Sequence, residues 1–197
     1  MKNNSTFVLL SEISETQIGS VLSRNISKSE SGFLAKILTL KSLSNNGAID
    51  LNKIESIYFS KTIDKKYLSQ KDDIVIRFSE PFTSCLITEN ETNLIIPSSL
   101  CRIRITSQDI MPSFLTWYLN SSFFNKQITK HIQTSTINII SMKMINNIEI
   151  PLIGMDTQKK ITDIQNLVTR YINLTNELES YQQIMGEEII KKFIQQE

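Results

Sequence analysis

The chain has 197 residues, of which 40% are hydrophobic and 8% aromatic, enough for one folded domain with an appendage. Its 21 basic and 20 acidic residues give a net charge of +1, which excludes a histone-like protein and an acidic tail but allows a local basic face. Phe7–Leu10 is too short for a signal sequence, and no apolar run approaches the ~18–20 residues of a membrane span. We therefore expect a cytoplasmic protein that does not contact a membrane.

Residues 33–105 have the pattern of a sheet. Alternation over 33–43 predicts a strand, and the turn signal Asn45-Asn46-Gly47 follows, because Asn and Gly tolerate the positive φ of a tight turn. Asp72 and Asp73 are interpreted as turn residues rather than a two-carboxylate site, since neighbours on a strand face opposite ways. An apolar run follows at residues 54–59, and further strands are predicted at residues 74–78, 85–88, 94–96 and 100–105.

Few side chains suit catalysis. The five glycines are too scattered for a phosphate-binding loop, and the single histidine, His131, is interpreted as a solvated residue near a helix end. One histidine is too few for a catalytic zinc site. Cys85 and Cys101 lie in apolar runs and are predicted to be buried thiols. The chain alone therefore has little with which to catalyse a reaction, and we expect no metal site.

Helices follow the predicted sheet. Pro112 and the apolar spacing after it predict a helix over 112–120, with Ser107 or Asp109 as its cap, and a second helix over 122–132. Trp117, Phe123 and Phe124 are interpreted as core residues rather than a platform for stacking bases. A polar loop over 133–141 and a strand over 148–152 complete this region.

From residue 156 the pattern becomes that of one helix of about 40 residues, hence about 60 Å long. Asp156 or Thr157 can cap it. Apolar residues then recur at alternating spacings of three and four over four heptads, which favours a coiled-coil partner. The alternative is a terminal helix packed on its own core. We predict an α+β fold with two domains, a β-rich globular domain with a few helices at 1–154 and a long coiled-coil-type helix at 155–197.

Charge divides near the same boundary. Residues 1–150 hold 16 basic and 13 acidic residues, a net charge of +3, whereas residues 151–197 hold 5 and 7, a net charge of −2. Residues 24–77 are more basic still, and residues 121–148 contain three lysines and no acid. The globular part is therefore the better candidate for binding a polyanion, and the helix for binding protein.

Four segments between residue 67 and about 170 resemble the specificity (S) subunits of type I restriction–modification enzymes. Residues 67–76 (YLSQKDDIVI) are similar to the family's leucine, loop, Gly-Asp and strand, with Asp72 in place of Gly. Residues 111–121 (MPSFLTWYLNS) are similar to P-x-(F/Y)-L-x-x-x-L-x-S. Residues 134–140 (TSTINII) resemble a Gly-(S/T)-rich loop with Thr134 in place of Gly. Residues 148–152 (IEIPL), with Gln158 and Ile161, match I-x-I-P-L-P-x-x-x-x-Q-x-x-I, with Ile153 in place of the second Pro.

This resemblance implies a non-catalytic subunit that recognises double-stranded DNA. The methyltransferase (M) subunit would bind S-adenosylmethionine, ATP would likewise bind only to partner subunits, which include the restriction (R) subunit, and this chain would bind no cofactor. S subunits usually have two recognition domains and two long helices, so a chain with one of each resembles half a subunit. The resemblance implies that the chain forms a homodimer, or pairs with a second half subunit, through long helices packed antiparallel.

The candidate site residues are polar or basic residues in predicted loops or at strand ends, and apolar residues of the long helix. The predicted DNA-binding residues are Lys36, Lys41, Asn45, Asn46, Arg77, Ser79, Thr83, Gln133, Thr134, Ser135, Thr136, Asn138 and Lys143. The predicted dimer and partner interface comprises Gln158, Ile161, Ile164, Val168, Tyr171, Leu178, Tyr181 and Met185. The rival hypothesis is a coiled-coil adaptor that binds no DNA. A lone nuclease or methyltransferase is disfavoured, because the chain lacks a methylation motif and a cofactor-binding glycine loop.

Overall fold

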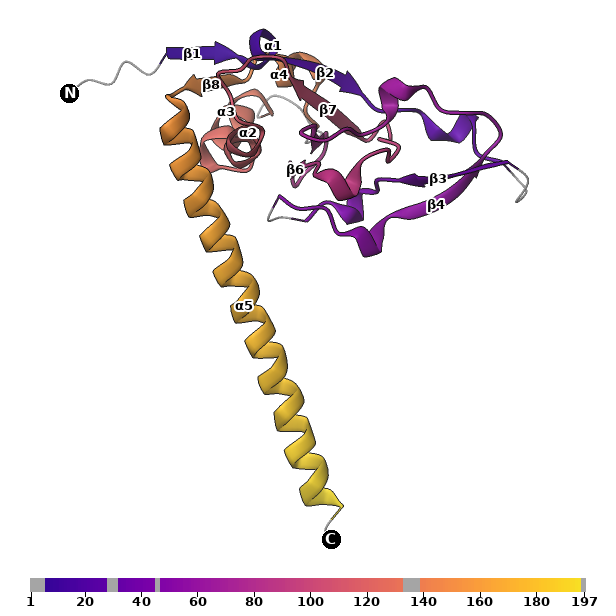
Figure 1. Cartoon of the computed structure of the whole chain (residues 1–197), viewed down its shortest axis with the longest axis vertical. Helices are drawn as coiled ribbons and strands as arrows, with labels where there is room; N and C mark the ends of the chain where they lie inside the picture. Colours follow the sequence, from indigo (N-terminus) through magenta and orange to yellow (C-terminus); the bar gives the residue numbers. More distant parts are fainter. Residues whose placement is uncertain (1–5, 28–31, 45–46, 133–138, 196–197) are drawn as a thin grey trace, which may run out of the picture. The chain divides into compact units, whose positions relative to one another are not determined.

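The computed structural model describes residues 6–27, 32–44, 47–132 and 139–195, which form eight strands and five α-helices (Figure 1). The chain divides into two units, residues 1–159 and residues 160–197. The strands are β1 (Thr6–Leu9), β2 (Ser14–Ile18), β3 (Phe33–Ile37), β4 (Glu55–Phe59), β5 (Ile74–Arg77), β6 (Ser84–Leu86), β7 (Leu100–Ile105) and β8 (Glu149–Leu152). The helices are α1 (Leu10–Ile13), α2 (Pro112–Leu119), α3 (Ser122–Ile132), α4 (Met142–Asn146) and α5 (Met155–Ile194). The predicted α+β class is confirmed.

The main sheet has four antiparallel strands in the order β2-β7-β5-β6. The alternation of Leu100–Ile105 places Ile103 opposite Ile74 and Thr16, and places Arg102 and Arg104 on the other face. Ile74, Ile103 and both cysteines are completely buried. The strands predicted at 74–78, 85–88 and 100–105 are thus present, with slightly different ends.

A smaller antiparallel pair, β3–β4, aligns Phe33 with Phe59 and Ile37 with Glu55. The predicted strand over 33–43 ends early, at Ile37. Beyond it the Leu38 amide donates to the Ile95 carbonyl (3.0 Å), and the Thr39 hydroxyl accepts the Ser42 amide to start a short 3₁₀ turn, Leu40–Ser42. The chain turns here because the Thr39 hydroxyl accepts the Ser42 amide. In a continuing strand, that amide would instead need a carbonyl of a neighbouring strand.

The strand predicted at 94–96 is also wrong. Ile95 makes only isolated bridges, parallel to Ile37 and antiparallel to Leu68, although all three residues of 94–96 are buried. Nearby, Gly19 follows β2 and passes against the backbone of Ile96 and Pro97 so closely that a Cβ atom would overlap their carbonyl oxygens. A short apolar run can therefore be buried without joining a regular ladder.

Helix α2 begins at Pro112 as predicted, but neither Ser107 nor Asp109 caps it. The cap position is Met111, whose amide donates to the side-chain oxygen of Gln158 (2.8 Å). Phe124 is completely buried in α3, whereas Phe123 is 59% exposed, so the prediction of a core role for Phe123 is wrong. Neighbouring residues on a helix face different directions, and only one of this pair reaches the core.

Helix α4 was not expected from the sequence. The Ser141 hydroxyl caps it by accepting the Met144 amide (3.2 Å), and Ile145 is its buried residue. Farther along, β8 pairs antiparallel with β1, the two strands at opposite ends of the globular unit's sequence.

Helix α5 contains 40 residues, about 60 Å at 1.5 Å per residue, and it is the last element of the chain. It begins at Met155, so Asp156 lies in the first turn rather than at the cap, where its charge is still favourable. The two units meet at residues 159 and 160, five residues beyond the predicted boundary, because the first turn of α5 belongs to the globular unit. Among the described residues, no helix is both long and apolar enough to cross a membrane.

Candidate nucleic-acid interface

Arg77, at the end of β5, ties together two segments that are far apart in sequence. Its Nη2 donates to the carbonyl of Leu40 and to that of Leu43 (3.1 Å). The 3₁₀ turn that carries the exposed Lys41 is thereby held at the end of the main sheet. Arg77 is half-buried, so part of its positive charge is used to position this loop.

The turn between β5 and β6 brings in Ser79 and Thr83. The Arg77 amide donates to the Thr83 carbonyl (3.1 Å), and Thr83 is 5% exposed. Ser79 forms an antiparallel bridge with Ile139, and the Ile140 amide donates to the Phe78 carbonyl (2.8 Å). Four predicted DNA-binding residues, Lys41, Arg77, Ser79 and Thr83, are thus gathered at one end of the sheet.

The other predicted residues are placed differently. Lys36 is exposed on β3 and lines a separate, mainly apolar groove of about 540 Å³ with Leu34, Lys65 and Ile95. Lys143 is exposed on α4, three residues after Ile140. Seven predicted residues lie outside the described residues: Asn45, Asn46, Gln133, Thr134, Ser135, Thr136 and Asn138. The described Gly47 has φ +84°, as the predicted turn requires.

A hollow of about 650 Å³ adjoins this turn, and most of its lining was missed by sequence reasoning. One wall is the turn Glu80–Thr83, and the others include Asn120, Asn125 and Thr129 from the end of α2 and from α3. The Asn120 amide is fully engaged, accepting from the Ser84 amide (2.9 Å) and donating to the Ser84 carbonyl (2.8 Å). The only sequence signal was the acid-free basic stretch over 121–148.

Ion pairs with carboxylates compensate the positive charge of several surface lysines. Three exposed lysines of the basic stretch 24–77 face a carboxylate: Lys53 pairs with Asp50, Lys66 with Asp64 and Lys71 with Glu89. Their hydrogen bonds to these carboxylates raise the pKa values of Lys66 and Lys71, whose positive charges are locally compensated. The uncompensated positive charge on the surface of this stretch is therefore smaller than its count of basic residues suggests.

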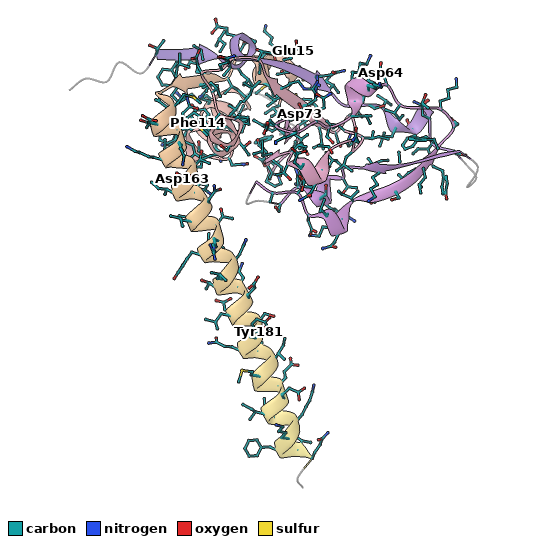
Figure 2. The ribbon with its side chains drawn as sticks, in the orientation of Figure 1. Glu15, Asp64, Asp73, Phe114, Asp163 and Tyr181 are labelled. Atoms are coloured by element: carbon teal, nitrogen blue, oxygen red, sulfur yellow. The ribbon has the colours of Figure 1, made fainter. Side chains whose placement is uncertain are left out.

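Arg102 and both cysteines are interior groups, whereas Arg104 is half-buried. Arg102 is 6% exposed and donates to the Gln17 side chain (3.0 Å), and burial lowers its pKa. Arg104 pairs with Asp73, whose place in the globular unit Figure 2 shows. Cys85 and Cys101 are free and buried, as predicted, and burial raises the pKa of each thiol to about 12. Reactive thiolates are therefore not expected at neutral pH.

The predicted interface residues of the long helix fall into two groups. Gln158 is completely buried in the globular unit, where its amide nitrogen donates to the carbonyls of Asp109 (2.7 Å) and Ile153 (2.8 Å). Ile161 is half-buried. The remaining six lie on α5 with 46–73% of their surface exposed, and Tyr181 projects from the helix in Figure 2. These six are Ile164, Val168, Tyr171, Leu178, Tyr181 and Met185.

The exposed apolar residues of α5 are too many for a solvated helix. Besides the six residues just named, they include Leu167, Leu174 and Ile189. Exposed apolar residues in this number are typical of a helix that packs against another surface. In the described part of the chain, no group of three His, Cys, Asp or Glu side chains is placed to hold a metal ion.

Several solved structures have a similar fold. The chain superimposes on the HsdS subunit of Thermoanaerobacter tengcongensis with a TM-score of 0.66 at 16% identity, covering 88% of this chain and 44% of that one. The S subunit of M. genitalium gives 0.55 at 17% identity, covering 89% and 42%. A chain from the structural study of "complex assembly and conformational transition of the type I R-M system" gives 0.62 at 16% identity, covering 88% and 40%.

The chain therefore spans less than half the length of these neighbours, and identities this low establish the fold alone. Among curated protein sequences, none is significantly similar. At the level of sequence families, the domain described as "Type I restriction modification DNA specificity domain" matches residues 2–184, nearly the whole chain. The chain belongs to the family of type I restriction–modification DNA specificity domains.

Proposed function

We propose that this chain is the sequence-specific DNA recognition subunit of a type I restriction–modification system, and that it binds one half of a bipartite site as a dimer. The observation that carries this proposal is the family match over residues 2–184. Specificity subunits of type I systems are non-catalytic, in keeping with the expectation from the sequence. The adenine methyltransferase and restriction subunits would act where this chain directs them, and S-adenosylmethionine and ATP would bind to those partners.

The residues gathered at the end of the main sheet support the first half of the proposal. Lys41 is exposed there, and its charge can neutralise a DNA phosphate and set the register of the protein on the duplex. Ser79 lies in the adjoining turn, where a hydroxyl can bond a base edge. The backbone of this turn is fixed by the Arg77 and Ile140 hydrogen bonds, and a rigid support of this kind favours precise contacts.

The apolar face of α5 supports the dimer. A second copy packed antiparallel along this face would bury Val168, Leu178 and their neighbours and place one recognition unit at each end. A symmetric dimer predicts two inverted half-sites separated by an unread spacer, because a DNA dyad mirrors a protein dyad. Pairing with a different half subunit predicts an asymmetric site. We also propose that the M subunit docks on this helix and that the complex works in the cytoplasm.

The decisive experiment compares methylated adenines across the genome of a strain that carries this gene and of a strain that lacks it. A split palindromic motif that disappears with the gene supports a homodimer, and a split asymmetric motif supports two different half subunits. Identical methylation in the two strains contradicts DNA recognition. A coiled-coil adaptor that binds no DNA predicts that outcome, together with no salt-dependent binding of duplex DNA by the complex with the M subunit.

A further inference from the structure

Helix α3 presents a face of two lysines and two small polar residues whose orientation is fixed by buried contacts. Phe124 and Ile128 are buried on one side of the helix. The Gln127 side chain donates to the Tyr118 hydroxyl (2.9 Å) and the Glu149 carbonyl (2.9 Å), and accepts the Glu149 amide (3.0 Å). α3 therefore cannot rotate without breaking three hydrogen bonds and exposing two core side chains.

The opposite side of the helix carries Asn125, Lys126, Thr129 and Lys130, all exposed, which we call the α3 lysine face. Lys126 and Lys130 are one helical turn apart, so their ammonium groups project from the same side. Within the described residues, neither lysine pairs with a carboxylate, in contrast to Lys53, Lys66 and Lys71. Their charges are available to an anionic ligand.

The α3 lysine face borders the 650 Å³ hollow, because Asn125 and Thr129 belong to both. The far wall of the hollow is the turn Glu80–Thr83, which includes one of the predicted base-reading residues, Thr83. Among the described residues that line the hollow, Glu80 of the turn is the acidic one. The two exposed lysines of α3 attract an anionic strand toward that wall of the hollow.

From this arrangement we propose that the α3 lysine face binds the sugar–phosphate backbone of one DNA strand beside the half-site. The inference rests on the proposed function and extends it to residues outside the predicted set. Lys126 and Lys130 lie about 6 Å apart along the helix axis, at 1.5 Å per residue. Their ammonium groups can therefore each neutralise one phosphate of the same strand. Such contacts position the protein on DNA and carry no sequence information.

The test measures the affinity of the full chain, in complex with the M subunit, for a fluorescent duplex over a series of NaCl concentrations. One duplex contains the methylated motif and a second lacks it. Lys126→Gln and Lys130→Gln are each expected to reduce the slope of log affinity against log salt by about 0.9, and the double variant by about 1.8. Both duplexes should lose affinity by the same factor, because phosphate contacts do not read sequence.

Two controls complete the design. Lys126→Arg keeps the charge and should keep the wild-type slope, and Lys191→Gln removes an equal charge from α5, where Lys191 pairs with Glu188, and should also leave it unchanged. A steep wild-type slope that Lys126→Gln and Lys130→Gln leave intact would overturn the inference while sparing the proposed function. A flat wild-type slope would overturn both.

Discussion

Arg104 on β7 and Asp73, the residue before β5, form a two-point ion pair, with Nε to Oδ1 at 2.7 Å and Nη2 to Oδ2 at 2.8 Å. The Asp73 side chain is completely buried, and Oδ2 also accepts the Gln70 amide (2.8 Å). The pair therefore joins the main sheet to the turn over 70–73. The hydrogen bonds that Arg104 donates to the Asp73 carboxylate raise the pKa of the guanidinium.

Replacing Arg104 by Gln should cost about 2 kcal/mol of unfolding free energy, because a buried carboxylate would lose its counter-charge. The matched control is Lys71→Gln, which removes the partner of Glu89 in a pair that is more than half exposed on both sides. That change should leave the free energy of unfolding nearly unchanged, because ion pairs exposed to solvent contribute little. Urea denaturation measures both values. If the two variants lost the same free energy of unfolding, the burial of Asp73 would not explain how much its ion pair with Arg104 contributes to stability.

Substitution of alanine for two glycines should have opposite effects. Gly19→Ala would drive a Cβ atom into the carbonyl oxygens of Ile96 and Pro97, and the displacement should cost about 2 kcal/mol. Gly186→Ala places its Cβ in open space in the middle of α5 and should stabilise the helix by about 1 kcal/mol. Thermal unfolding followed by far-UV circular dichroism measures both, and a neutral Gly19→Ala would contradict the close approach.

The free energy of unfolding should fall at alkaline pH through the two buried thiols. Burial raises the pKa of Cys85 and Cys101 from 9.0 to about 12. Between these values the unfolded chain binds fewer protons than the folded chain, so stability decreases as pH rises, by up to about 1.4 kcal/mol per pH unit for each thiol. Below pH 9 this contribution is fully retained.

Cys85→Ala and Cys101→Ala isolate this effect from the titration of other groups. Each variant starts from a lower stability, because it leaves a small cavity, but should lose stability less steeply than wild type between pH 9 and 12. Urea midpoints across this range supply the profiles. Profiles parallel to that of wild type would mean that the thiols ionise equally in both states.

A single negative charge should have different effects on self-association when it is placed on the apolar side and on the polar side of α5. Val168→Asp places a carboxylate in the apolar stripe and should weaken self-association at least tenfold, because a buried valine contributes about 1.5 kcal/mol or more. Asn173→Asp adds the same charge on the polar side of the helix and should leave association unchanged. Sedimentation equilibrium measures the dissociation constants. Equal weakening by both variants would point to general charge repulsion and against an interface on the stripe.

Local sequence patterns predict which strands and helices form in this protein, but they predict less well which residues of those elements contact one another. The alternation of Leu100–Ile105 and the spacing in α5 determine β7 and the long helix, because each pattern extends over several residues and matches one period. A run as short as Leu94–Ile96 carries no period, and α4 has only five residues. Phe123 and Phe124 look alike in sequence, yet only one reaches the core.

The candidate site depended on contacts that no local pattern contains. The Arg77 hydrogen bonds to Leu40 and Leu43 cross more than thirty positions, and they help to hold Lys41 at the end of the main sheet. In the same way, Lys53, Lys66 and Lys71 contribute to the basic count of the sequence, but their charges are compensated in the folded protein. The α3 lysines stand out only once these pairs are known.

The pairing of β1 with β8 has a consequence for synthesis of the protein on the ribosome. Thr6 lies opposite Leu152 and Leu9 opposite Glu149, so a strand that is made early waits for a partner made near the end of the globular unit. Until then the nascent chain exposes an unpaired strand edge, the kind of surface that promotes aggregation. We expect truncated products that stop before Glu149 to be the aggregating species when the gene is overexpressed.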